Sequence, residues 1–260
     1  MAKLKLSPLK NFFFQTEQLI CFSGRVVKAT FSRPFYLTET IEQMYLGGVG
    51  SLWLVALTGI LAGEAIAINF SNELADFGAK SYLGRIMVLA IVRELGPTLT
   101  GLMVAARVAS GITAEVGSMK SSNQIDALRA YSIDPLKKVA VPRLIALLIM
   151  VPALTVICDV VGLIGGYIIA IFLGHISPSL YWAPVFQHLN FGNITMGLLK
   201  PVVFAFIIAF VSLWKGFLSE GGAKGVGVAT NQSVVITSIT ILLANFVITQ
   251  AIFKAIKGYF

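Results

Sequence analysis

Charge is scarce in this sequence, since Asp, Glu, Lys and Arg make up only 12% of its 260 residues. Soluble globular domains are about one quarter charged, so this composition excludes an ordinary soluble domain. Hydrophobic residues make up 57% of the chain, and they form runs long enough to need the bilayer as their solvent. The sequence therefore predicts an all-α integral membrane protein, because helices satisfy their backbone hydrogen bonds within each span.

Cysteine and histidine are equally rare. The two cysteines, Cys21 and Cys158, are too few for a disulfide framework and lack the spacing of metal ligands. The two histidines, His175 and His188, fall in one predicted loop without other ligands nearby. The sequence also has no G-x-x-x-x-G-K-[ST] phosphate loop, catalytic triad or paired carboxylates. We therefore expect no catalytic residue, no metal and no cofactor in this chain, and no enzyme activity of its own.

Basic residues outnumber acidic ones, which gives a net charge of +8. In so apolar a chain, lysine and arginine mark cytoplasmic loops and anionic lipid headgroups, so we expect no nucleic-acid partner. The N-terminal MAKLKLSPLK precedes an apolar stretch that lacks the length and cleavage site of a signal peptide. We expect this segment to be retained.

Five stretches are long and apolar enough to cross a bilayer, which requires roughly 20 residues. They are residues 43–63, 82–117, 144–174, 193–214 and 225–253. Lysine and arginine gather before the first span, between the second and third, and between the fourth and fifth. The positive-inside rule then predicts a cytoplasmic N-terminus and a C-terminus on the outer side, although Lys254 and Lys257 lie there.

Residues 1–40 carry a different pattern, in which apolar and small residues recur at near-helical spacing and basic residues lie elsewhere. The recurring positions are Leu9, Phe12, Phe13, Thr16, Ile20, Ser23, Val27 and Phe31. The pattern is typical of a basic amphipathic helix in the membrane interface, and Pro34 is expected to end it. We therefore divide the chain into an interfacial segment, 1–40, and a transmembrane domain, 41–260.

The second span contains its most unusual residues at 92–97, where the sequence reads Val-Arg-Glu-Leu-Gly-Pro. Charges at membrane depth are costly, so they are expected to face a protein interior, a cavity or a transport path. Pro97 removes one backbone donor and crowds the carbonyl of Arg93, four residues earlier. The segment predicts a kink and a charge pair at one point. The alternative is an Arg–Glu pair that only ties two helices together.

Asp159 is the lone charge of the third predicted span. Together with Arg93 and Glu94 it could form the ion path of a secondary transporter or channel. The simpler interpretation is a buried carboxylate that is hydrogen-bonded to a neighbouring helix, or a carboxylate near the membrane surface. A third reading of the whole chain is a scaffold without a transport path.

A short helix is predicted between the second and third spans, at about 121–132, with Ser122 as its cap and Pro135 as its end. Ile125 and Leu128 give it an apolar edge, and Asp126 and Arg129 lie beside that edge. One interpretation is a docking element for a soluble partner. The other is an ordinary interfacial loop helix.

Four blocks together resemble the MlaE/YrbE permease family, the membrane subunits of lipid-moving ABC transporters that work with MCE proteins. The blocks are Val-Arg-Glu-Leu-Gly-Pro at 92–97 with the following residues to Arg107, Thr-Ala-Glu-Val-Gly-Ser-Met-Lys at 113–120, the segment from Gln-Ile-Asp-Ala-Leu at 124–128 to Val-Pro-Arg at 141–143, and Gly-Gly-Ala at 221–223 with Gly-Val-Gly-Val-Ala-Thr at 225–230, ending in Phe-Val-Ile-Thr at 246–249. They lie within most of residues 40–253. Asn123 and Asn245 stand where the family usually has acidic residues.

The resemblance implies a homodimer in the bacterial inner membrane, with the C-terminus periplasmic and a phospholipid pocket at the protomer interface, built from the first two spans. It implies a periplasmic MCE-domain partner and a separate cytoplasmic ABC ATPase that binds ATP and Mg²⁺. The expected contacts with this ATPase are Gln124, Ile125, Asp126, Leu128 and Arg129.

The resemblance also implies lipid-binding residues. Arg93 and Glu94 match the family's polar pair, and Lys200 matches a lysine that could meet a headgroup phosphate or snorkel to the interface. Ile66, Phe70 and Phe77 could line an acyl-chain cavity, or could simply pack between helices. The function that follows is a permease subunit moving phospholipid between a membrane and an MCE partner, driven by ATP hydrolysis in a separate subunit.

Overall fold

The computed structural model describes residues 8–257 of the chain, which are helical nearly throughout and include no strand. Five segments in this range are long and apolar enough to cross a membrane. They are Leu37–Asp76, Lys80–Ser121, Leu136–Phe172, Phe191–Leu218 and Gly222–Ile252. This confirms the predicted all-α membrane fold with five spans. Each span is as long as or longer than its apolar stretch, because polar residues at the ends continue the helices.

The first three spans are built from several helical pieces, and the last two from one helix each. Span one comprises α2 (Leu37–Gly47), the 3₁₀ turn η1 (Val49–Ser51) and α3 (Leu52–Asp76). Span two comprises the 3₁₀ turn η2 (Lys80–Tyr82), α4 (Leu83–Met87), the π-helix η3 (Val88–Leu95), α5 (Gly96–Val104), the π-helix η4 (Ala105–Ala109) and α6 (Ser110–Ser121). Span three comprises the π-helix η5 (Leu136–Ala140) and α8 (Val141–Phe172), span four is α10 (Phe191–Leu218), and α11 (Gly222–Lys257) provides span five. Outside the spans, the described chain forms α1 (Pro8–Thr30), α7 (Gln124–Ala130) and α9 (Pro178–His188).

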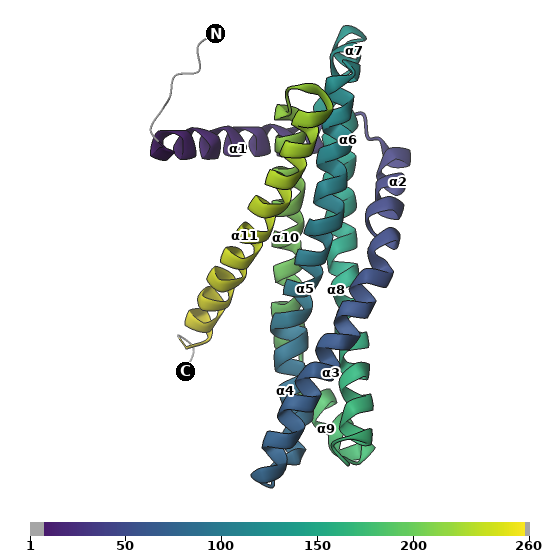
Figure 1. Cartoon of the computed structure of the whole chain (residues 1–260), viewed down its shortest axis with the longest axis vertical. Helices are drawn as coiled ribbons and strands as arrows, with labels where there is room; N and C mark the ends of the chain where they lie inside the picture. Colours follow the sequence, from purple (N-terminus) through teal and green to yellow (C-terminus); the bar gives the residue numbers. More distant parts are fainter. Residues whose placement is uncertain (1–7, 258–260) are drawn as a thin grey trace.

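The bundle has two distinct ends (Figure 1). The end that holds α1, α7 and the turn from α10 to α11 is called the α7 end. The other, called the α9 end, holds α9 and the turn between α3 and span two. The three segments that are richest in lysine and arginine therefore share the α7 end. This is the arrangement that the positive-inside pattern requires of segments on one side of a membrane.

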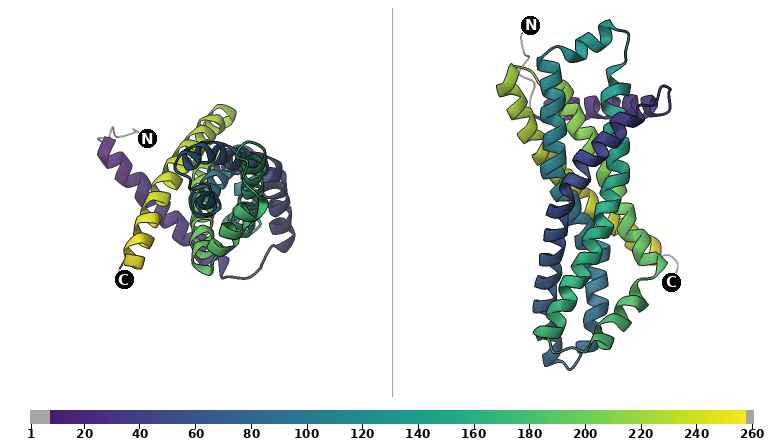
Figure 2. Two further views of the ribbon diagram at one scale, coloured as in Figure 1. Left: turned by 90° about the horizontal axis from the view of Figure 1, so that it is seen from below. Right: turned by 90° about the vertical axis from the view of Figure 1, so that its right-hand side faces the viewer.

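Helix α1 lies across the bundle at the α7 end, as Figures 1 and 2 show. Phe22, Val26 and Ala29 are buried on one of its faces, whereas Ile20 on the opposite face and Phe31, just past the end of the helix, are exposed. The predicted apolar stripe therefore points away from the bundle, as an interfacial helix requires, and its contact with lipid stays a prediction. The helix ends at Thr30, before Pro34. The side chains of Leu9, Phe12 and Phe13 lie outside those that the structure describes.

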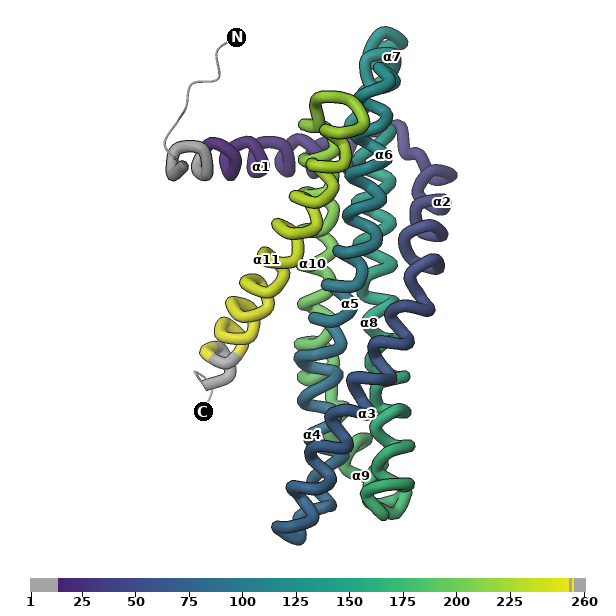
Figure 3. The backbone as a smooth tube through the Cα atoms, in the orientation of Figure 1, coloured from purple at the N-terminus to yellow at the C-terminus, as the bar shows by residue number. Residues whose placement is uncertain are grey.

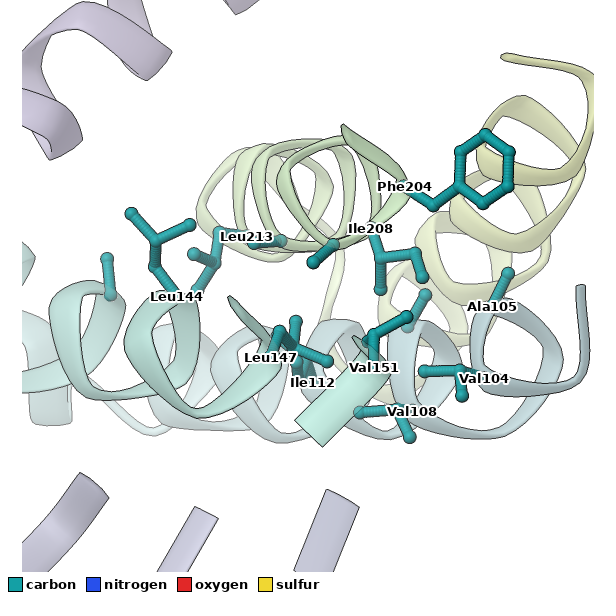
Figure 4. Packing of buried hydrophobic residues seen from close by; sticks show 14 of the residues in the cluster. Val104, Ala105, Val108, Ile112, Leu144, Leu147, Val151, Phe204, Ile208 and Leu213 are labelled. Atoms are coloured by element: carbon teal, nitrogen blue, oxygen red, sulfur yellow. The ribbon is translucent and has the colours of Figure 1, made fainter. Parts of the chain in front are cut away.

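The main core runs between spans two, three and four at the α7 end and the middle of the bundle (Figure 4). Figure 4 shows Val104, Val108 and Ile112 of span two facing Leu147 and Val151 of α8, with α10 packed beside them. A second buried cluster near the α9 end joins α4 and η3 to α9 and the outer part of α8. These two cores hold spans two, three and four together as one unit.

Spans one and three touch through their backbones, because glycines face each other across the contact. A Cβ atom on Gly63 of α3 would overlap the carbonyl of Gly162 on α8, and one on Gly59 would lie 2.7 Å from the carbonyl oxygen of Cys158. Small residues spaced four apart allow membrane helices to approach this closely, since lipid offers no hydrophobic force to join them. The stripe Gly59–Gly63 is thus a packing surface.

Helix α11 is held differently along its length (Figure 3). Near the α7 end, Ser233 and Thr237 are buried, and the Thr113 hydroxyl of α6 donates 2.9 Å to the Ser233 hydroxyl. Beyond Ile241, no side chain of α11 that the structure describes is fully buried. The tube in Figure 3 shows this half leaning away from the other spans. Only the half near the α7 end is firmly packed.

The prediction of a simple loop between spans three and four was wrong, because residues 178–188 form α9. Tyr181 of α9 is fully buried, and its hydroxyl donates 2.8 Å to the Leu163 carbonyl of α8. Burial raises the pKa of the Tyr181 phenol, so this group stays a neutral donor. The aromatic residues of the segment form a helix because Tyr181 anchors it to α8, a contact that periodicity does not reveal.

Candidate functional site

The charges of span two sit where its helix is widened. The π-helix η3 ends at Leu95, and Pro97 follows at the start of α5. Because Pro97 has no N–H, the Arg93 carbonyl lacks its usual helical donor. The ammonium of Lys200 replaces it, donating 2.9 Å to the Arg93 carbonyl oxygen. The predicted backbone defect is thus present, and a side chain from span four satisfies it.

Lys200 reaches η3 because α10 comes unusually close to it. A Cβ atom on Gly197 of α10 would overlap the Val92 carbonyl, so only glycine permits this approach. Lys200 lies one turn further along α10 and donates 2.7 Å to Glu94 Oε2. Its side chain is only 1% exposed, so the ion pair is the main compensation for burying the ammonium.

Span five also contributes a side chain that contacts Glu94. The Thr249 hydroxyl of α11 lies 3.3 Å from Glu94 Oε2 and 3.4 Å from Oε1. The Arg93 Nε atom lies 3.9 Å from Glu94 Oε1 on its other side. We call Arg93, Glu94, Lys200 and Thr249 the Glu94 cluster. It joins spans two, four and five through one carboxylate.

The Glu94 cluster is partly open. The Glu94 side chain is 33% exposed, compared with 16% for Arg93 and 1% for Lys200. Glu94 is therefore the charge that a ligand would meet first, with Lys200 beneath it. With two cations and one carboxylate, the cluster has a formal charge of +1. Such a group within a membrane span suits a substrate with negative charge.

The other expected lipid contacts lie on α3 and, for Phe77, directly after its last residue. Ile66 packs against the buried cluster that includes Met87 and Ile91, whereas Phe70 and Phe77 are exposed. The Glu94 cluster is formed by spans two, four and five, so within one chain the polar pair does not sit between spans one and two. A protomer interface that brings α3 to it stays a prediction, as do the lipid contacts themselves.

Asp159 is buried on α8, apart from the Glu94 cluster. Its Oδ1 atom packs against Gly96, where any Cβ would overlap it. In the described part of the chain, Oδ1 accepts no hydrogen bond, and Asp159 is in no ion pair. The expected hydrogen bond to a neighbouring helix is therefore not seen, and neither is a charged chain joining the three residues.

The short helix between spans two and three is α7, and it begins at Gln124. The prediction that Ser122 caps it was wrong, because the Ser122 hydroxyl donates 2.8 Å back to the Ser118 carbonyl and so belongs to the end of α6. The residue directly before the helix is Asn123, which has a φ of 58°. This left-handed residue makes the sharp turn between α6 and α7, a conformation that asparagine tolerates.

Two of the five predicted coupling residues face inward. Ile125 is buried in the main core and Leu128 packs against it. Asp126 and Arg129 are exposed and form an ion pair of 2.8 Å. Tyr131, at the end of α7, is 79% exposed and was not identified from the sequence. The sequence did contain a signal for Tyr131, because it is an aromatic residue at the end of a predicted docking helix.

No group of three His, Cys, Asp or Glu side chains within residues 8–257 could hold a metal ion. The chemistry of the Glu94 cluster is that of ion pairing and hydrogen bonding. It can recognise a charged group at membrane depth.

Comparison with known proteins gives consistent results. A family model described as Permease MlaE matches residues 40–251. A probable ABC transporter permease protein of Rickettsia typhi is 40% identical over 233 residues, which is 90% of each chain. The intermembrane phospholipid transport system permease protein MlaE of Haemophilus influenzae is 31% identical over 83% of each chain. The chloroplastic protein TRIGALACTOSYLDIACYLGLYCEROL 1 of Arabidopsis thaliana is 32% identical over 96% of this chain and 71% of its own.

Proposed function

Because the chain belongs to the MlaE permease family of ABC transporters, we propose that it is the subunit through which phospholipid crosses or leaves a bacterial inner membrane. The observation that carries the proposal is the Glu94 cluster. It is a partly open charged group, formed by three spans, at a depth where unused charge would be costly.

The charge of the cluster fits a phospholipid. The phosphate would offset the net positive charge, pairing with Arg93 and with Lys200 once Glu94 shifts. Acyl chains need apolar surface, and Phe70 on α3 and Phe77 just after it offer this surface, together with the half-buried Ile66. A few polar groups that select the headgroup beside apolar walls are typical of ligand sites.

The energy source in this proposal is another polypeptide. The sequence contains no phosphate-binding loop, so an ABC ATPase that holds ATP and Mg²⁺ would dock on α7. The α7 end would then be cytoplasmic, in agreement with its basic segments. An MCE-domain protein would meet the α9 end in the periplasm, and a second copy of the chain would complete the lipid pocket.

The packing of α7 suggests how force is transmitted. Ile125 and Leu128 fix α7 to the core between spans two and three. A pull on α7 by the ATPase would therefore move these spans as a unit. Span two carries Glu94, whereas Thr249 sits on the loosely packed half of α11. Relative movement would break the contact between them and open or close the cluster.

Phospholipid transfer should depend on the charges of the Glu94 cluster. In vesicles containing the full complex, Glu94→Gln and Arg93→Ala are each expected to lower the rate of transfer of a fluorescent phospholipid about tenfold, because a charge-assisted contact is lost. Asp159→Asn serves as the comparison and should keep most of the rate. Unchanged transfer in both cluster variants would exclude this route.

The same vesicles distinguish the main alternative, a secondary transporter or channel. That function needs Asp159 to continue a path from Arg93 and Glu94, and the described contacts do not link it to them. Ion flux through the chain without an ATPase, abolished by Asp159→Asn, would favour the alternative.

Docking on α7 can be separated from the folding of α7. Exposed ion pairs contribute about 0.5 kcal/mol or less, so Asp126→Asn with Arg129→Gln should leave thermal stability nearly unchanged while strongly reducing co-purification of the ATPase. Ile125→Ala removes a buried anchor and should cost about 2 kcal/mol or more of stability. Full ATPase recovery with the exposed double variant would argue against docking at these two residues.

A further inference from the structure

A pocket of about 410 Å³ lies beside α7, and none of the residues of the Glu94 cluster lines it. Its walls come from α2, the end of α6, α7 and the start of span three. Leu46, Met119 and Leu128 give it an apolar surface, and charged side chains line the remainder. The pocket thus combines an apolar part with ionic groups, as a site for an amphiphilic ligand does.

Two of the three acidic groups come from α2, and the third, Glu115 of α6, is paired with Arg143. Glu39 and Glu42 lie one turn apart and both line the pocket. In the described part of the chain, neither carboxylate takes part in an ion pair or side-chain hydrogen bond. Two unpaired carboxylates next to apolar surface offer a place for one cationic group with several N–H donors.

The basic groups come from span three. Arg143 is only 6% exposed, with Nη2 at 2.6 Å from Glu115 and Nη1 donating 2.7 Å to the Val139 carbonyl. Its Nε atom is buried and has no hydrogen-bond partner within the described chain. Lys138 lies in the same lining. Arg143 is held by Glu115 and the Val139 carbonyl, and its Nε atom is enclosed, so Lys138 is the cation of this lining that is left to meet a ligand.

The pocket is continuous with exposed apolar surface on span one. Leu46, which lines it, is 54% exposed, and Val49 and Trp53 continue the exposed apolar surface along span one. In Figure 1, α2 begins at the level at which α1 crosses the bundle. The pocket therefore lies at the depth of lipid headgroups, with a path for acyl chains directly below it.

We propose that this pocket binds one zwitterionic aminophospholipid, such as phosphatidylethanolamine, from the leaflet at the α7 end. Glu39 and Glu42 accept hydrogen bonds from its ammonium group. Lys138 donates to its phosphate, and its acyl chains run along Leu46, Val49 and Trp53. The bound lipid bridges span one and α7, so it stabilises the position of α7. It is a resident lipid, separate from cargo at the Glu94 cluster.

The test counts lipids that stay bound to the purified full chain, using native mass spectrometry after incubation with phosphatidylethanolamine or phosphatidylglycerol. The wild-type chain should retain one phosphatidylethanolamine in preference to phosphatidylglycerol. Glu39→Gln with Glu42→Gln should weaken this retention about tenfold, because charge-assisted hydrogen bonds are lost. Glu73→Gln, an exposed carboxylate elsewhere on span one, should retain it, and so should Glu94→Gln, which separates this pocket from the Glu94 cluster.

Leu46→Trp provides a second variant, which obstructs the pocket and keeps both carboxylates; it should also lose the bound lipid. Equal retention of the two phospholipids by the wild type would mean annular lipid only and would overturn the proposal. Unchanged retention in both pocket variants would overturn it as well. Loss of ATPase co-purification with lipid retention intact would assign the pocket to a basic side chain of the partner instead.

Discussion

Replacing Lys200 by methionine is expected to lower the free energy of unfolding by about 3–5 kcal/mol, because it leaves a partly buried carboxylate without its main partner. The substitution removes two hydrogen bonds at once, the 2.7 Å contact with Glu94 and the 2.9 Å contact with the Arg93 carbonyl. That carbonyl would then lose its side-chain donor, and Pro97, four residues on, has no N–H to replace it. Thermal unfolding of the detergent-purified chain measures the effect.

Lys215→Met is the matched control, because Lys215 also lies on α10 but contacts the exposed Gln232 side chain and the Trp214 ring rather than a carboxylate. It should destabilise the chain much less than Lys200→Met. Adding Glu94→Gln to Lys200→Met should recover part of the loss, because the stranded charge is then removed. Equal stability of the two lysine variants would show that the ion pair does not hold spans two and four together.

Replacing Gly63 by leucine should have an effect of similar size, with a loss of about 3 kcal/mol or failure to fold, because a side chain has to enter a backbone contact. Even a single Cβ at Gly63 would overlap the Gly162 carbonyl. Span one could then stay in the bundle only by moving away from α8. The yield of monodisperse protein and its midpoint of thermal unfolding report this directly.

The control for Gly63→Leu is Gly111→Ala, since a Cβ at Gly111 meets no atom within 4 Å. Alanine is the better helix former by about 1 kcal/mol, so this variant should be as stable as the wild type or slightly more so. A Gly63→Leu chain with wild-type yield and stability would mean that α3 and α8 do not touch at this position.

The spans were predictable from sequence because the bilayer sets a local requirement. Each segment such as Leu136–Phe172 is recognisable by its own length and hydropathy, whatever its neighbours are. The short helices were less predictable than the spans. The start of α7 was misplaced because both Ser122 and Asn123 suit a helix end, and α9 was missed because a buried tyrosine anchors it.

The candidate site was predictable only in part. Arg93, Glu94 and Pro97 stand out in an apolar run, and the free carbonyl of Arg93 follows from the chemistry of proline. That Lys200 pairs with Glu94 could not be derived, because 106 residues separate them. Thr249, which is 155 residues from Glu94, was identified only as part of a motif. A polar residue in a span indicates that it has a polar partner, but the sequence does not identify that partner.

The sequence by itself determined that this chain is a membrane protein, the number of its spans and the positions of its charged residues within them. Each of these features depends on the transfer of one local segment from water into the bilayer. Only the tertiary structure decided what those charges contact. Gly63 lets span one approach span three, and Gly197 lets span four approach span two, where Lys200 meets the carboxylate of Glu94 and Thr249 of span five joins it. Such contacts depend on the packing of distant helices, which local hydropathy does not encode.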